Sequence, residues 1–529
     1  MAKEVDMKLY DTTLRDGAQR EGMALTVDDK LKIAAKLDEF GMHYIEGGFP
    51  GSNPRDQEFF KKAAKLDLKA TLVAFGSTRR KHIKPQDDPN LLALVEVGVG
   101  AVCIVGKSWD VHVSEALLTT LEENLKMIAD SVAFLKAAGL EVIYDAEHFF
   151  DGYAANPEYA LETIKTAEGA GADWIVLCDT NGGQLPHQIE PVVEKVVASV
   201  KTPVGIHTHN DSDCAVANTL AAVNGGASQV QGTVNGYGER CGNANLCSIV
   251  PDLALKMGVK TVSAKQLSAV TELAHYVAEI ANAVPDNHQP YVGQSAFAHK
   301  GGIHVSGALR RQGAYEHVEP AVIGNHPTIV ASELSGATTI IEKAKEIGFD
   351  LSDKKNKVAE LLNKLKAKAN EGYTYDAADG SLGIFILKNI GAYKPVFQLE
   401  SYEISVNRRR SGVTESQAIV KLRIDGGRLV AVGEGNGPVN ALDRALKQAL
   451  KSVEPNVEKI NLTDYKVRVI DAAKGTRAKV RVFIESTDGD NSWGTIGVHE
   501  NIIEASWEAL VDGLEYGLSR MSAITPLAY

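Results

Sequence analysis

The chain has 529 residues, 44% of them hydrophobic and 23% charged, and its 56 Lys and Arg against 68 Asp and Glu give a net charge of −12. This length accommodates two or three domains, and the acidic balance argues against a nucleic-acid or anionic-membrane surface. The five cysteines form no CxxC pair and suggest no disulfide framework. With no signal-peptide pattern and no apolar run of about 20 residues, we expect a cytoplasmic protein.

Short apolar runs alternate with amphipathic stretches through the first half of the chain. They predict strands near residues 7–11, 43–49, 70–75, 99–105, 141–147, 173–179, 203–209 and 228–234, and helices near 27–40, 55–66, 88–97, 119–138, 157–170, 187–199, 212–224 and 246–257. At one helix start, Thr26 and Asp29 have the spacing of a capping box. Eight strand–helix repeats in about 260 residues favour an α/β fold with a parallel (β/α)8 TIM barrel, and a doubly wound open sheet is the alternative.

The pattern changes twice beyond the predicted barrel. A helix is expected near 264–283, followed by a loop region at 286–327 and by helices near 333–347, 353–370 and 376–389. From about 396 the pattern is mostly β and repeats, with strands at 418–424 and 429–432 before a helix at 439–452, and strands at 465–471 and 478–486 before a helix at 501–517. Glycines 433, 435, 437, 494 and 497 are expected between strands and helices. We therefore divide the chain into a catalytic barrel (1–285), a linker subdomain covering a barrel mouth (286–395) and an α+β regulatory domain of doubled units (396–529).

Two motifs at predicted strand ends carry candidate metal ligands. The segment DTTLRDGAQR, residues 11–20, follows the first strand, and His207-Thr208-His209 ends the seventh. Because side chains alternate across a strand, His207 and His209 point to the same side. Two imidazoles with Asp16 as a carboxylate suit a divalent cation. An isolated HxH is more often a polar strand end, but the preceding repeats favour the metal interpretation.

A glycine-rich loop, NGYGERCGNANL at residues 235–246, follows the eighth strand. Its glycines allow a tight turn whose backbone approaches a ligand, and Asn243 could complete the metal shell. Such a loop is weak evidence alone, since most are only turns. Thiol chemistry at Cys241 is disfavoured because no base is adjacent in the sequence.

The motifs DTTLRDGAQ, HTHND and GYGERCGNANL, in this order, resemble those of the DRE-TIM metallolyases. Within that family the chain resembles the Claisen-condensing branch of 2-isopropylmalate, homocitrate and citramalate synthases. The resemblance covers essentially the whole chain, because the branch also has a linker subdomain and a C-terminal regulatory domain. It implies an acyltransferase that uses a divalent metal ion to condense acetyl-CoA with a 2-keto acid.

The resemblance assigns roles to individual residues. The residues that match the metal ligands are Asp16, His207 and His209, with Asn243 near the metal. Arg15 matches the arginine beside the keto oxygen, and Glu46 matches a glutamate that helps hold Arg15.

Glu147 and Thr180 match residues around the keto acid in this family. His304 and Tyr315 lie in a linker segment that, in the family, reaches over a barrel mouth of the partner subunit, at positions implicated in proton transfer. We expect His304, oriented by Glu147 or another carboxylate, to remove a proton from the acetyl methyl group with help from Tyr315. A histidine suits this role because its pKa lies near neutral pH.

The choice of keto acid depends on pocket size, and one methylene is worth only about 1–3 kcal/mol. The strand-end candidates that would line this pocket are Phe75, Val105, Tyr144 and Asp145, of which Tyr144 is expected to bind the substrate. The opening segment and YDAEHFFDGY most resemble the bacterial citramalate synthases, which implies pyruvate in an isoleucine biosynthesis route. The alternatives are 2-ketoisovalerate, as in isopropylmalate synthases, and the homocitrate synthase substrate. Asp213-Cys214, where the family commonly has Gly-Leu, is a departure.

The resemblance also implies a homodimer whose C-terminal domain binds isoleucine as feedback effector, and deletion of 396–529 should abolish that inhibition. The ligand types do not choose between magnesium, manganese and zinc. Two other classes stay open: an acyl-CoA carbon–carbon lyase, against which residues 396–529 argue, and a non-catalytic amino-acid sensor. Intact Arg15, Asp16, His207 and His209 argue against the sensor.

Overall fold

The computed structural model describes residues 7–299, 307, 311, 315–329, 337–346, 349–375, 378–424, 426–470, 475, 477–489 and 491–523. The chain divides into two compact units, one of Met1–Phe297 with Val318–His326 and the other of Ala298–His317 with Pro327–Tyr529.

The first unit is a closed barrel of eight parallel strands in the order β1 to β8. The strands are β1 Lys8–Asp11, β2 Tyr44–Gly48, β3 Thr71–Ser77, β4 Ala101–Lys107, β5 Glu141–Glu147, β6 Trp174–Asp179, β7 Val204–Thr208 and β8 Gln229–Gly232. Because β1 pairs with β8, for example Leu9 with Val230, the sheet is closed. The predicted TIM barrel is confirmed and the open sheet is excluded.

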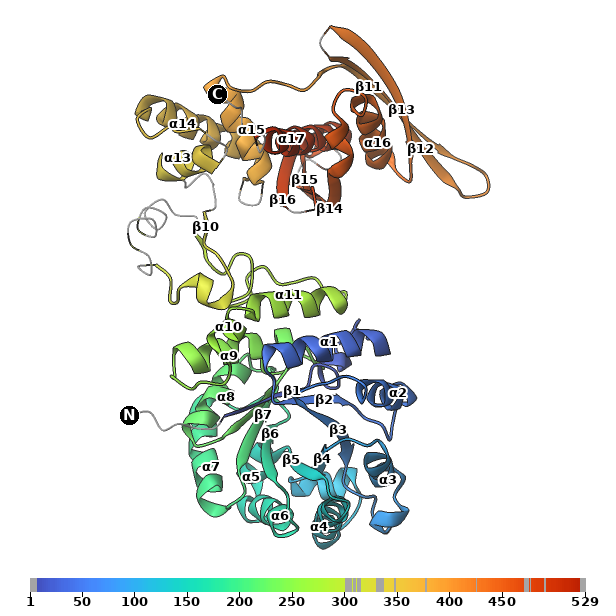
Figure 1. Cartoon of the computed structure of the whole chain (residues 1–529), viewed down its shortest axis with the longest axis vertical. Helices are drawn as coiled ribbons and strands as arrows, with labels where there is room; N and C mark the ends of the chain where they lie inside the picture. Colours follow the sequence, from blue (N-terminus) through green and yellow to red (C-terminus); the bar gives the residue numbers. More distant parts are fainter. Residues whose placement is uncertain are drawn as a thin grey trace. The chain divides into compact units, whose positions relative to one another are not determined.

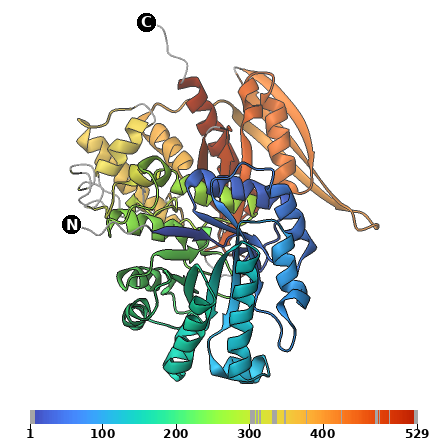
Figure 2. The ribbon, with the colours of Figure 1, turned by 60° about the horizontal axis from the view of Figure 1, so that its bottom comes forward.

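The helices lie outside the strands (Figures 1 and 2). They are α1 Val27–Phe40, α2 Pro54–Ala63, α3 Pro89–Glu96, α4 Leu121–Ala137, α5 Phe149–Ala155, α6 Pro157–Gly169, α7 Pro186–Ser199, α8 Ala215–Asn224 and α9 Leu246–Leu255. The capping box is present at the start of α1, where the Thr26 side chain accepts from the Asp29 N–H and the Asp29 side chain accepts from the Thr26 N–H. Gly41 ends α1 at a φ of 99°, which favours glycine.

Helix α5 was not predicted, because it is short and follows β5 with only His148 between them. A β-carbon at Gly152 would lie 2.3 Å from the Ser108 carbonyl oxygen. The glycine therefore lets α5 pack directly on the backbone that follows β4.

The predicted helix at 264–283 is two helices, α10 Ala264–Leu267 and α11 Val270–Ile280. The chain leaves helical geometry at Ala269, whose φ and ψ are −99° and 3°. The Thr271 hydroxyl donates to the Ile323 carbonyl at 2.7 Å, which ties α11 to the 3-10 turn Pro320–Ile323 of the same unit.

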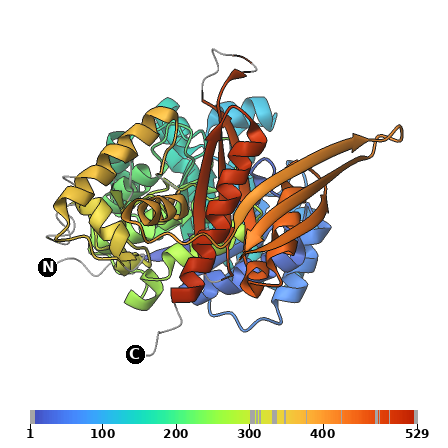
Figure 3. The ribbon, with the colours of Figure 1, turned by 90° about the horizontal axis from the view of Figure 1, so that it is seen from above.

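Among its described residues, the second unit holds a short parallel pair, the helices α13 to α15 and two three-stranded antiparallel sheets, each followed by a helix. The elements are β9 Ala298–His299, β10 Thr328–Ile329, α13 Ala337–Glu346, α14 Lys355–Glu371, α15 Asp379–Ile390, β11 Gln398–Arg408, β12 Thr414–Ile424, β13 Gly427–Gly435, α16 Pro438–Leu450, β14 Asn461–Val469, β15 Val480–Thr487, β16 Ser492–His499 and α17 Ile502–Ala523. In Figure 3, α17 lies along the sheet of β14 to β16. The expected doubling of strands and helix is confirmed.

The short strands β9 and β10 and the longer strands β11 and β16 of this unit were not predicted by the sequence patterns. Gly497 lies within β16 and Gly433 within β13, not in loops before the helices. A β-carbon at Gly497 would lie 1.9 Å from the Ala505 carbonyl oxygen of α17, and one at Gly433 would lie 2.4 Å from the Ala441 carbonyl oxygen of α16. These glycines mark the close approach of a helix to the third strand in each repeat.

Within the part of the chain that the structure describes, no helix combines the length and apolarity needed to cross a membrane. All five cysteines are free thiols, and Cys103, Cys178 and Cys247 are buried.

Candidate metal centre and active site

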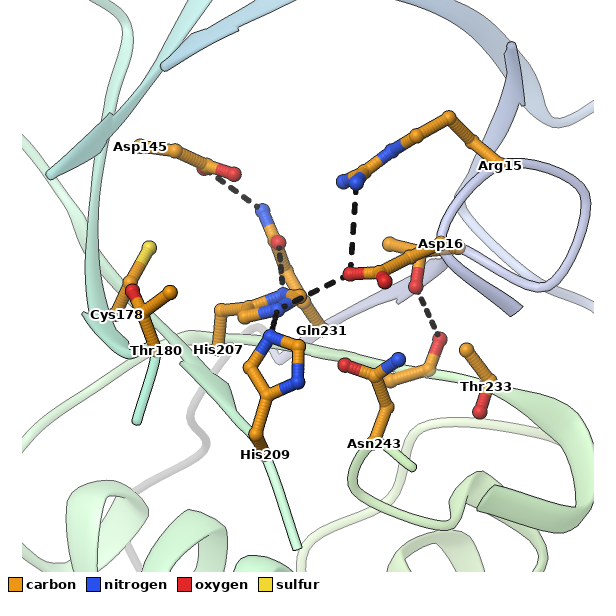
Figure 4. A network of polar contacts seen from close by, with 12 residues as sticks. Arg15, Asp16, Asp145, Cys178, Thr180, His207, His209, Gln231, Thr233 and Asn243 are labelled. Atoms are coloured by element: carbon orange, nitrogen blue, oxygen red, sulfur yellow. Dashed lines mark hydrogen bonds and ion pairs between the residues drawn. The ribbon is translucent and has the colours of Figure 1, made fainter. Parts of the chain in front are cut away.

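Asp16, His207 and His209 meet at the carboxyl ends of the barrel strands (Figure 4). Asp16 lies in the turn after β1, His207 on β7, and His209 directly after β7. Their ligand atoms all lie within 4.8 Å of one another. Nε2 of His207 is 3.1 Å from Nε2 of His209 and 3.4 Å from Asp16 Oδ2. All three residues are at most 6% exposed, so the sequence-predicted ligand set is brought together in a dry site.

The charges around this cluster favour an ionised carboxylate and a neutral imidazole. Burial opposes ionisation of Asp16, but Arg15 and the two histidines hold the pKa of Asp16 far below its ordinary value. Burial and the neighbouring His207 lower the pKa of His209 to about 3. A carboxylate beside an unprotonated imidazole is the donor pair that a divalent cation requires.

Buried polar atoms around the cluster test whether a cation fits. Among the described residues, Asn243 Oδ1 is buried with no hydrogen-bond partner, while Asn243 Nδ2 donates to the Tyr237 carbonyl at 3.1 Å. Asn243 also bridges to His209 through the backbone. The two Nε2 atoms at 3.1 Å cannot both carry protons without repulsion. One divalent cation would satisfy both features: it would accept the lone pairs of the two imidazoles and lie near the unpartnered Oδ1 of Asn243.

Arg15 is held beside Asp16 by three neighbours. Its Nε donates to Glu46 Oε1 at 2.5 Å, and the Tyr10 hydroxyl donates to Glu46 Oε2 at 2.6 Å. The guanidinium carbon lies 3.8 Å from the Phe75 ring centroid, and Nη1 lies 3.5 Å from Asp16 Oδ2. Glu46 is fully buried, so it orients the arginine as the resemblance implied.

Glu147 and Thr180 lie at the same ends of the barrel strands. Glu147, at the end of β5, forms an ion pair with Lys107 at the end of β4. The Thr180 hydroxyl accepts from the His148 N–H at 2.9 Å, and the Thr180 carbonyl accepts from Arg240 Nη2 at 2.7 Å. Lys107 was not anticipated, since a single lysine at a strand end carries no motif.

Tyr144 does not line this mouth. It belongs to the hydrophobic layer between strands and helices, where a β-carbon at Gly106 would lie 2.6 Å from its ring. Strand alternation sends Asp145 into the barrel instead, where it accepts from Gln231. The expectation that Tyr144 binds the substrate is therefore wrong. On β5, Tyr144 faces the helices, and Asp145 faces the barrel interior.

The sequence patterns also missed Gln231, which lies on β8 against His207. Gln229 and Gln231 are both fully buried. The sequence does carry a sign of this role: two glutamines occupy alternate positions of a predicted core strand. Buried amides need specific hydrogen-bond partners, so such a pair indicates a polar network inside the barrel.

The structure does not test the two residues expected to transfer protons. His304 lies outside the described residues. Tyr315 lies in the second unit, where it is 43% exposed and close to Gly307. The proton-transfer roles of both residues stay predictions.

Three family descriptions match successive parts of the chain. HMGL-like matches residues 6–277, homocitrate synthase post-HMGL domain-like matches 291–373, and LeuA allosteric (dimerisation) domain matches 376–518.

Curated relatives match over nearly the whole length. The (R)-citramalate synthase of Aquifex aeolicus is 51% identical over 515 residues, which cover 97% of this chain and 98% of that protein. The (R)-citramalate synthase of Geobacter sulfurreducens is 48% identical over 520 residues, 98% of each chain. The 2-isopropylmalate synthase of Methanocaldococcus jannaschii is 32% identical over 516 residues, 97% of this chain and 95% of that one.

Proposed function

The chain belongs to the HMGL-like family, in the branch of the (R)-citramalate synthases, and on this premise we propose that it condenses acetyl-CoA with pyruvate to give (R)-citramalate and CoA. The full-length similarity to (R)-citramalate synthases carries the proposal, and the buried Asp16, His207 and His209 cluster supports it. A 2-isopropylmalate synthase activity is the second candidate, supported by the more distant relative of that name.

The polar residues at the barrel mouth suit a 2-keto acid. A divalent cation held by Asp16, His207 and His209 would polarise the keto group and offset the charge that develops on its oxygen. Arg15 adds a permanent positive charge beside the same position, and its ion pair with Glu46 limits its motion. Because Glu46 and the Phe75 ring fix the guanidinium of Arg15, its charge needs little reorganisation during the reaction.

The condensation also requires removal of a proton from the acetyl methyl group. We assign this step to His304 with assistance from Tyr315, following the family resemblance. The resulting carbanion attacks the keto carbon of pyruvate. Water then hydrolyses the thioester and releases CoA as a thiol. Glu147 and Thr180 line the keto-acid side of the mouth in this proposal, and Lys107 forms an ion pair with Glu147 there.

Finer properties follow from the same premise. The donor set accepts magnesium, manganese or zinc. The match of residues 376–518 to an allosteric dimerisation domain supports a homodimer with an allosteric effector. We propose isoleucine as that effector, since citramalate leads to isoleucine in the proposed route. We place the reaction in the cytoplasm, as part of isoleucine biosynthesis.

The test is thiol release from acetyl-CoA by the purified protein with pyruvate, 2-ketoisovalerate or 2-ketoglutarate, followed by chiral chromatography of the product. We expect release with pyruvate and a single (R)-citramalate peak. Release with 2-ketoisovalerate in place of pyruvate would transfer the proposal to the second candidate. A lack of release with all three substrates would contradict condensation.

A further inference from the structure

Gln231 connects the metal cluster to the barrel interior, and the proposed reaction gives it no role. Its Oε1 lies 3.0 Å from Nδ1 of His207, and its Nε2 lies 3.3 Å from Asp145 Oδ1 (Figure 4). Nε2 also lies 3.4 Å from Gln229 Oε1. All of these side chains are buried, so water does not replace any of these contacts.

Asp145 decides which way the Gln231 amide faces. Burial raises the pKa of Asp145 to about 6. Above that pH its carboxylate is ionised and only accepts hydrogen bonds, so the atom of Gln231 beside Asp145 is the amide nitrogen. The carbonyl oxygen then faces His207 and can only accept. Nδ1 of His207 therefore carries a proton, which leaves Nε2, the nitrogen that faces Asp16 and His209, as the one that a cation can bind.

Barrel strands hold these groups in register. Gln231 is the direct partner of His207 between β7 and β8, and of Tyr10 between β8 and β1. Asp145 lies on β5, across the interior. A side chain that orients a metal ligand keeps its geometry better on a rigid strand than on a loop.

We propose that Gln231 is a positioning residue of the metal centre: its amide, oriented by Asp145, keeps His207 in the tautomer that directs Nε2 at the cation. Partners behind a metal-ligating histidine commonly contribute about 10- to 100-fold to metal affinity. The inference rests on the proposed function only in that Asp16, His207 and His209 bind the cation.

The first test is manganese affinity without substrates, measured by competition with a chelator. Gln231→Met keeps the side-chain volume but removes the acceptor, and we expect the Kd to rise about 10- to 100-fold. Gln448→Met makes the same chemical change at an exposed position of α16, and its Kd should equal that of the wild type. Circular dichroism of each variant verifies that the barrel is folded.

A carboxylate–amide exchange separates orientation from simple packing. In the double variant Asp145→Asn with Gln231→Glu, the carboxylate now on β8 accepts from His207, and the amide now on β5 donates to that carboxylate. The net charge is the same as in the wild type. We expect this variant to bind manganese within about tenfold of the wild type. A steric role predicts no such recovery relative to Gln231→Met.

The second test reads the ring protonation of His207 by ¹⁵N–¹H correlation in the protein loaded with diamagnetic zinc, with a His207 variant for assignment. We expect an Nδ1–H signal in the wild type and a weakened or absent one in Gln231→Met. Manganese binding by Gln231→Met equal to the wild type, or a zinc-loaded wild type in which His207 has no Nδ1–H, would overturn the role of Gln231 alone. No manganese binding by the wild type would overturn this role together with the proposed metal centre.

Discussion

Arg15 is held in position by its neighbours in the barrel. Glu46 accepts from its Nε, the Phe75 ring lies under its guanidinium carbon, and Asp16 faces its Nη1. A planar guanidinium satisfies a carboxylate and an aromatic face together, whereas an ammonium group does not. The charge that Arg15 brings to the barrel mouth thus depends on its shape as well as on its sign.

For Arg15→Lys we expect kcat to fall about 100-fold, as when one preorganised group that stabilises developing charge is lost. The manganese Kd should stay close to the wild-type value, because Asp16, His207 and His209 are unchanged. Steady-state thiol release and chelator competition on the same preparation measure both quantities. A wild-type kcat in Arg15→Lys would show that the guanidinium has no part in the reaction.

Motif and strand alternation were sufficient to predict most of this cluster. His207 and His209 share a face because they are two residues apart at the end of β7, and Asp16 follows β1 in a motif with few structural alternatives. Tyr144 was misplaced because both it and its neighbour Asp145 were candidates at the end of β5, whereas alternation lets only one of them, Asp145, face the interior. Gln231 and Lys107 lie in strands and carry no motif, so only the closed barrel shows what they face.

At the scale of elements, the position of α5 is determined by a close contact with the backbone that follows β4. Gly152 lies against the Ser108 carbonyl, and the next residue along, Trp109, packs its ring 4.8 Å from His112 and 6.0 Å from His148. The contact thus joins the segments that follow β4 and β5 beside the Lys107–Glu147 pair.

For Gly152→Ala we expect a loss of about 1–3 kcal/mol in unfolding free energy, because the added methyl group has backbone atoms as its neighbours. Gly169→Ala is the matched control, since a β-carbon there meets nothing within 4 Å at the end of α6. That control should be neutral or gain up to about 1 kcal/mol. Thermal unfolding of both variants measures the difference, and equal midpoints would contradict the packing argument.

Helix α17 buries a carboxylate that favours its neutral form. Burial raises the pKa of Asp512 to about 6, although Lys388 and the Ser381 hydroxyl favour the charge. The Ser381 hydroxyl donates to Asp512 at 2.8 Å, and Lys388 Nζ lies 3.3 Å away. Because the folded-state pKa exceeds the ordinary value of 3.8, the native state binds the proton more tightly than the unfolded chain does.

Asp512 should therefore reduce stability as pH rises from about 4 to 6, with no further change above that range. We expect Asp512→Asn to exceed the wild type by roughly 1–3 kcal/mol at about pH 7.5 and to match it near pH 4. Calorimetric unfolding of the full chain across this range provides the comparison. A difference that is constant with pH would show that Asp512 does not titrate in this way.

At the scale of the whole molecule, the strand–helix repeats predicted the barrel and the doubled C-terminal sheets. Strands β11 and β16 were not predicted, because exposed polar residues fill most of β11 and glycines interrupt β16. Helices α13 to α15 share a hydrophobic core with Ile496 and Val498 of β16. A cut at residue 396 would expose that core, so feedback is better tested on the intact chain.

We expect isoleucine to inhibit thiol release by the full-length protein, with leucine and valine as matched controls of similar size and polarity. Inhibition curves at fixed pyruvate and acetyl-CoA provide the measurement. Equal inhibition by all three amino acids, or by none, would contradict the proposed effector.

Condensation by this protein should depend on a cation held by Asp16, His207 and His209. To test this, metal-free wild type and His207→Ala are titrated with manganese, and bound metal and thiol release with pyruvate are measured in the same samples. We expect one manganese per wild-type chain, with activity rising in step, and neither metal nor activity in His207→Ala. Full activity of the metal-free wild type, or equal manganese binding by His207→Ala, would contradict it.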